Sequence, residues 1–126
     1  MPVRSSVAIP SSSGQPAGRR RQRFAQGGGV YNNSLLDLRR VVVGANLAKA
    51  TGASGAAEGG GIWNGVAITG PPVTLTLTDS LVSHNAATGS AGIERRGGGL
   101  FTTEPVTLTR TRLAGNVPDQ CFGCSP

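Results

Sequence analysis

Three glycine triplets, each followed by an aliphatic residue and then an aromatic one, constrain what this chain of 126 residues can fold into. The triplets and their followers read Gly-Gly-Gly-Val-Tyr-Asn from Gly27, Gly-Gly-Gly-Ile-Trp-Asn from Gly59 and Gly-Gly-Gly-Leu-Phe-Thr from Gly97. An alternating run follows each triplet, and the asparagines that end these runs are Asn46, Asn85 and Asn116.

The spacing of these landmarks indicates a true repeat. First glycine to terminal asparagine is 19, 26 and 19 residues, and asparagine to the next triplet is 13 and then 12. The period is therefore about 32 residues, with one insertion of 7 residues in the middle copy. Periods of this length are typical of stacked repeat architectures.

Each copy contains strand-like sequence. Residues 73–78 alternate apolar and hydroxylated side chains with period two, which is typical of a half-buried strand. Glycine triplets suit one sharp corner, and asparagine suits another because it tolerates the left-handed region. We expect three short strands per copy, joined by corners into one coil of a parallel β-helix. Asn46, Asn85 and Asn116 would then stack as a hydrogen-bonded ladder, which satisfies amides that could not be buried singly.

Composition agrees with an all-β chain. Glycine supplies 20 residues and proline 8, while charged residues are only 14%. That balance is against helix bundles, and the clustered glycines exclude collagen. No apolar run reaches the roughly 18 residues of a membrane-spanning helix, and residues 1–26 lack the apolar segment of a secretory signal.

The predicted organisation has three parts. Residues 1–26 are rich in Ser, Pro and Gly and hold five arginines without an acid, so they are expected to be a disordered basic tail. Residues 27–119 form the β-helix, with repeats at 27–58, 59–96 and 97–119. Residues 120–126 form a C-terminal loop with a C-x-x-C motif.

The repeat, best seen in Gly-Gly-Gly-Ile-Trp-Asn and Val-Thr-Leu-Thr-Leu-Thr-Asp-Ser-Leu-Val-Ser-His-Asn-Ala, resembles the right-handed parallel β-helix repeats of bacterial surface proteins. These have a pectin-lyase-like fold and are similar in pattern to polymorphic outer-membrane proteins. The resemblance covers about residues 27–119. It implies a secreted or cell-surface location, and because members are usually longer, a fragment of a longer β-helix is one interpretation.

The resemblance specifies the function of the chain less well than its fold, since the parallel β-helix scaffold hosts many activities. The leading hypothesis is a non-enzymatic structural or adhesive module whose flat faces present Thr, Ser, Asn and Arg to a polysaccharide. The alternative is a polysaccharide lyase or glycoside hydrolase on the same fold. A second alternative is binding of nucleic acid or an anionic surface through the Arg19–Arg23 cluster, which predicts salt-sensitive affinity.

The six acids do not occupy equivalent repeat positions, as a stacked calcium site would require. Asp79 aligns with Arg40 and Arg110, which predicts a solvated charge pair. Glu58 and Glu94 each precede a glycine triplet, so a glycosidase pair formed by loops stays open. No catalytic, metal or cofactor residue is assigned.

The remaining reactive side chains have plain interpretations. His84 is the single histidine and aligns with Ala45 and Gly115, which indicates a tolerant turn position. Cys121 and Cys124 lack the extra ligands of a zinc site and the strand–helix setting of a redox motif. They are expected to be a disulfide or two free thiols. Three coils alone would expose strand edges at both ends, so self-association through the coil ends is also expected.

Overall fold

The structure is a computed structural model that describes residues 2–3, 6–9, 22–66 and 72–124. Within those ranges the chain is all-β, and every strand pairing is parallel. The same residues include no helix long and apolar enough to cross a membrane. The arrangement is compatible with a parallel β-helix.

The strands follow one another in coils of five. The first full coil contains β4 (Val30–Asn32), β5 (Leu35–Arg39), β6 (Val42–Gly44), β7 (Leu47–Ala50) and β8 (Ser54–Glu58). The second contains β9 (Ile62–Asn64), β10 (Thr74–Thr78), β11 (Leu81–Ser83), β12 (Ala86–Gly89) and β13 (Ile93–Arg96). The third contains β14 (Leu100–Thr102), β15 (Val106–Thr109) and β16 (Arg112–Ala114), and β17 (Cys121–Phe122) follows.

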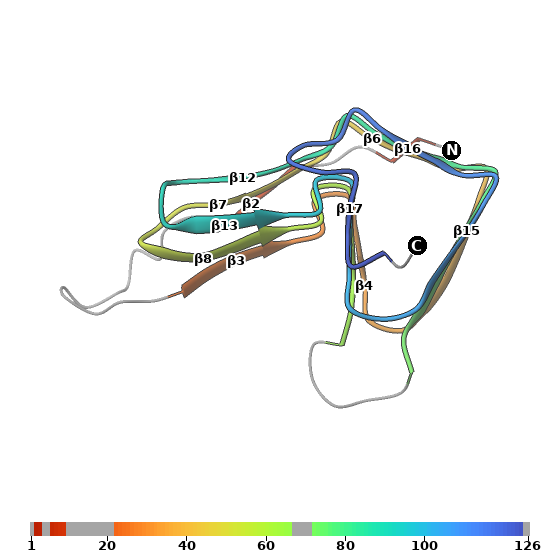
Figure 1. Cartoon of the computed structure of the whole chain (residues 1–126), viewed down its shortest axis with the longest axis horizontal. Coiled ribbons are helices and arrows are strands. Elements are labelled where there is room, and N and C mark those ends of the chain that lie inside the picture. The colour runs from red at the N-terminus through yellow and green to blue at the C-terminus, as the bar shows by residue number, and fades with distance from the viewer. Residues whose placement is uncertain (1, 4–5, 10–21, 67–71, 125–126) are drawn as a thin grey trace.

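Equivalent strands of successive coils pair into five sheets, which are seen end-on in Figure 1. Three sheets enclose a body of roughly triangular outline: β4–β9–β14–β17, β5–β10–β15, and β6–β11–β16 with β1 (Pro2–Val3) beside β6. The other two sheets form an arm of two facing layers that projects from one corner. They are β2 (Ser6–Ile9) with β7 and β12, and β3 (Gln22–Gln26) with β8 and β13.

The expectation of three strands per coil is wrong, because each spacer between an asparagine and the next glycine triplet adds two more. These spacers are rich in alanine and glycine, which strand propensity disfavours. Their small side chains let the two arm sheets pack closely. The buried cluster between these sheets is Ala25, Ala48, Ala50, Ala57, Ala87 and Ile93.

The body has its own apolar core. Ile62, Leu77 and Leu100, which occupy β9, β10 and β14, are fully buried. Val43, Leu75 and Val82 complete the buried cluster, and the equivalent residues of the end coils are half-buried against it. Burial follows the period-two alternation of β10, whose leucines point inward and threonines outward.

Glycine triplets lie at the neck, where the chain returns from arm to body. The first glycine of each triplet has positive φ, at +74°, +67° and +65° for Gly27, Gly59 and Gly97. The second glycine of each triplet does not have a positive φ, but it lies very close to neighbouring backbone. A Cβ on Gly60 would overlap the carbonyls of Ala86 and Gly98. The triplets are therefore required partly for torsion and partly for close backbone approach.

Residues 1–26, which we expected to be a disordered tail, contain three short strands in the parts that are described. β1 (Pro2–Val3), β2 (Ser6–Ile9) and β3 (Gln22–Gln26) pair in parallel with β6, β7 and β8 of the next coil. Their composition gives little strand signal, but each adds to a preformed sheet edge that supplies its backbone hydrogen bonds. Residues 1, 4–5 and 10–21 lie outside the described part of the chain.

Candidate functional site

The three predicted ladder asparagines lie in one buried column at the neck. Asn46 and Asn85 each donate from backbone and side chain to the Oδ1 of the next asparagine, over 2.9 to 3.1 Å. Asn85 Nδ2 also donates to the Val43 carbonyl. Gln120 ends the column, since its Oε1 accepts from the Asn116 backbone N–H and side-chain Nδ2.

The corner torsion belongs to a different residue from the one expected. Positive φ occurs at Ala45 (58°), His84 (58°) and Gly115 (69°), each directly before the ladder asparagine. The asparagine side chain is thereby turned inward to bond along the stack. A second column escaped the sequence interpretation: Asn32 Nδ2 donates to Asn64 Oδ1, and Asn64 Nδ2 to Thr102 Oγ1. Its signal was the polar residue after each aromatic.

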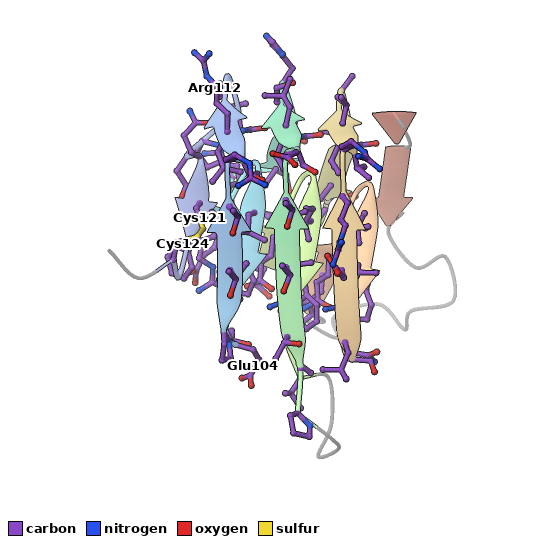
Figure 2. All side chains as sticks on the ribbon, turned by 90° about the vertical axis from the view of Figure 1, so that its right-hand side faces the viewer. Glu104, Arg112, Cys121 and Cys124 are labelled. Carbon is purple, nitrogen blue, oxygen red and sulfur yellow. A yellow bond between two sulfur atoms is a disulfide. The ribbon has the colours of Figure 1, made fainter. Side chains whose placement is uncertain are left out.

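The outer side of the β5–β10–β15 sheet is a regular surface, which we call the flat face and which Figure 2 turns toward the viewer. Two rows run across the strands. One row is Asp37, Thr76 and Thr107, and the next is Arg39, Thr78 and Thr109. The flat face thus presents hydroxyl groups on a rigid sheet, with charges on its first strand.

Arginines gather where the flat face ends. Arg40, Asp79 and Arg110 occupy the corner with positive φ, and Arg110 Nε lies 2.5 Å from Asp79 Oδ1. The hydrogen bond from Arg110 lowers the pKa of Asp79 below its ordinary value, and the charges of Arg110 and Arg40 act in the same direction. Arg112, labelled in Figure 2, is exposed and has no acidic partner in the described part of the chain.

We expect Arg110→Ala to raise the pKa of Asp79 toward its ordinary value. A depressed folded-state pKa stabilises the fold above the unfolded-state pKa, and this is lost as pH falls through the folded-state value. The effect on stability should be small because both groups are exposed. Carboxyl-carbon NMR titration measures it. Arg112→Ala should leave the Asp79 titration unchanged, and an equal shift in both variants would contradict the pairing.

Glu58 and Glu94, the candidate glycosidase pair, do meet, but through Arg96. Glu58 is 5% exposed, is ion-paired with Arg96 and accepts hydrogen bonds from Trp63 Nε1 and Gln26 Nε2 at 3.2 Å each. Glu94 Oε2 lies 3.6 Å from the other arm of the same guanidinium. Glu58 is therefore a buried structural acceptor with three hydrogen-bonding partners.

The other acids are dispersed. Asp37 pairs with Arg39 on the flat face, while Asp119 Oδ1 accepts from the backbone N–H of Gly97 at 2.7 Å. Among the residues that the structure describes, no group of three or more His, Cys, Asp or Glu side chains could hold a metal ion. His84 is exposed at its corner, and its ring lies over Gly115.

A column of stacked aromatic rings was missed, although an aromatic residue after each triplet was its signal. Tyr31, Trp63, Phe101 and Phe122 stack on successive strands, with ring centroids 4.6, 6.2 and 5.3 Å apart and planes within 10°. They lie outside the body, in the angle between body and arm that we call the elbow. Trp63 and Phe101 are 5% exposed, and each lies between two other rings of the stack. The Arg96 guanidinium of the arm lies over the stack, 5.6 Å from the Phe101 centroid.

The C-terminal loop makes some of the contacts that a further coil would make with the third one. Cys121 and Cys124 are joined by a disulfide, and β17 pairs with β14 so that Phe122 extends the aromatic stack. In the coil before, the N–H of Gly59 donates to the backbone carbonyl of Arg96. The equivalent N–H of Gly97 donates instead to the side chain of Asp119. Arg19, Arg20 and Arg21 lie outside the described residues, as does the side chain of Arg23.

The chain was compared with protein families, curated proteins and solved structures. No family model, no curated protein and no solved structure matches the chain. What is established is an all-β chain of parallel sheets with asparagine and aromatic columns.

Proposed function

We propose that this chain is a non-enzymatic adhesive module that binds an acidic polysaccharide along the flat face. The observation that carries the proposal is the pair of threonine rows beside an arginine-rich corner. In a strand, alternate side chains repeat about every 6.8 Å, and neighbouring strands are about 4.8 Å apart. Hydroxyls at such fixed spacings suit a linear polymer of hydroxylated rings.

Charge favours an acidic polymer over a neutral one at this face. Arg39, Arg40, Arg110 and Arg112 outnumber Asp37 and Asp79 there. Guanidinium groups bind carboxylates well because their donors match the two oxygens. Single-stranded nucleic acid is favoured less, since it needs aromatic stacking platforms and these rows contain none.

The resemblance to right-handed, pectin-lyase-like β-helices supports the same proposal, as does the implied bacterial surface or secreted location. Self-association through the coil ends is part of it, because among the described residues β5 and β15 are the outermost strands of their sheet. The engagement of Glu58 with three partners argues against the alternative of a lyase or hydrolase.

The proposal is tested by measuring the affinity for a polyuronate by calorimetry at about 0.05 M and about 0.5 M salt. We expect wild type to bind more weakly at high salt. Arg112→Ala combined with Thr76→Ala should lower the affinity about tenfold at low salt, because one ionic and one neutral contact are lost. Lys49→Ala, which removes an exposed cation from the arm, is the matched control.

Two results would overturn the proposal. One is an equal loss of affinity in the Lys49 variant, which would mean that only net charge matters. The other is polysaccharide turnover by wild type that Glu58→Gln or Glu94→Gln abolishes, which would assign the elbow to catalysis.

A further inference from the structure

The outer side of the β3–β8–β13 sheet, next to the elbow, has a hollow of about 270 Å³. Phe24 of β3 forms one wall, and Glu94 and Arg96 of β13 form the opposite one. Gly55 and Ala56 of β8 lie between them as the floor. The hollow is therefore built entirely on strands, which fix its walls better than loops would.

Strand register explains why the hollow exists. Phe24, Ala56 and Glu94 are direct neighbours in three adjacent strands. The backbones of Phe24 and Glu94 are then two strand spacings apart, roughly 9.6 Å. Between these two longer side chains β8 contributes only small residues: Ala56, which is 2% exposed, and Gly55, which has no side chain and leaves the floor of the hollow open.

The apolar wall is open. Phe24 is 42% exposed, and none of the ring contacts in the described part of the chain involves it, unlike the four rings of the elbow stack. An exposed aromatic face on a rigid strand offers a platform for the C–H face of another ring.

The polar wall is held in place from behind. The guanidinium of Arg96 is ion-paired with buried Glu58 and lies 5.4 Å from the Phe122 ring centroid. The Glu94 side chain is 71% exposed and lies 3.6 Å from Arg96. Glu94 thus lines the hollow beside a guanidinium that Glu58 already holds in place, so less entropy is lost in ordering that guanidinium on binding.

We propose that this hollow binds one uncharged sugar ring, with its C–H face on Phe24 and its hydroxyl groups donating to Glu94. The chemistry is that of a ligand apolar on one face and hydroxylated at its edge. Glu58 and Arg96 neutralise each other, so the remaining Glu94 charge disfavours acidic rings. The volume is below the roughly 300 Å³ at which pockets for larger ligands begin, which suits a single ring. The site is separate from the flat face, and the inference does not rest on the function proposed there.

The test is NMR titration of the full chain with neutral hexasaccharides of glucose, xylose, mannose and galactose. We expect one of them to shift the amide signals of β3, β8 and β13, with an affinity insensitive to salt. Phe24→Ala should weaken binding about tenfold, Phe24→Tyr should restore it, and Glu94→Gln should weaken it several-fold. Thermal melts of each variant confirm that the fold is retained.

Variants of the two faces separate the two proposals. Arg112→Ala with Thr76→Ala should leave neutral-sugar binding unchanged, and Phe24→Ala should leave polyuronate binding unchanged. The inference is overturned if no neutral hexasaccharide shifts these strands, if Phe24→Ala binds as wild type does, or if alkylammonium ions alone occupy the hollow.

Discussion

Gly60→Ala should destabilise the protein by about 3 kcal/mol or more, beyond the usual range for overpacked positions. A Cβ at this position would stand closer than 3.0 Å to the carbonyl oxygens of Ala86 and Gly98. Both obstacles are backbone, so no side-chain rotation can relieve the overlap. Relief requires the arm to move away from the body, which breaks the hydrogen bonds of Gly60 N–H and its neighbours.

Urea unfolding followed by circular dichroism measures this loss, and Gly44→Ala is the matched control. A Cβ on Gly44 would meet the Ser83 carbonyl at 3.4 Å, an ordinary contact. Its stability should stay within about 1 kcal/mol of wild type. Equal stabilities for the two variants would mean that the neck is looser than its backbone contacts indicate.

Asn85→Ala should cost about 3 to 5 kcal/mol, because Asn85 is fully buried and bonds to three neighbours. The change removes the Oδ1 that accepts from the Asn46 backbone and side chain. It also removes the donor to the Val43 carbonyl and to Asn116 Oδ1. Each buried polar group left without a partner costs about 1 to 3 kcal/mol.

Asn33→Ala controls for the loss of an asparagine as such. Asn33 is exposed, so its replacement should change stability by no more than about 0.5 kcal/mol. The measurement is again urea unfolding, with hydrogen exchange of the Asn46 amide as a local probe. An Asn85 variant as stable as the Asn33 variant would contradict the ladder as a source of stability.

The body could be anticipated from sequence because its signals are local. Alternation in residues 73–78 marks a strand, and the fixed distances from Gly59 to Asn85 and from Gly97 to Asn116 mark the repeat. The arm could not be anticipated from the sequence, since its alanine-rich strands form only because two sheets meet face to face. The hollow beside Phe24 was also beyond sequence, because its walls are 70 residues apart in the chain and are joined only by register.

The sequence by itself determined that this protein is a stack of repeats, with a half-buried strand at residues 73–78 and asparagines at fixed distances from the glycine triplets, since periodicity expresses local geometry and burial. The tertiary structure alone decided that each coil folds out into an arm and that the second glycine of each triplet must lack a side chain. It also brought Arg96 across the aromatic stack to Glu58. These features depend on contacts between strands of different coils, and the physical reason is that backbone pairing across the stack, rather than residue preference, sets which side chains become neighbours.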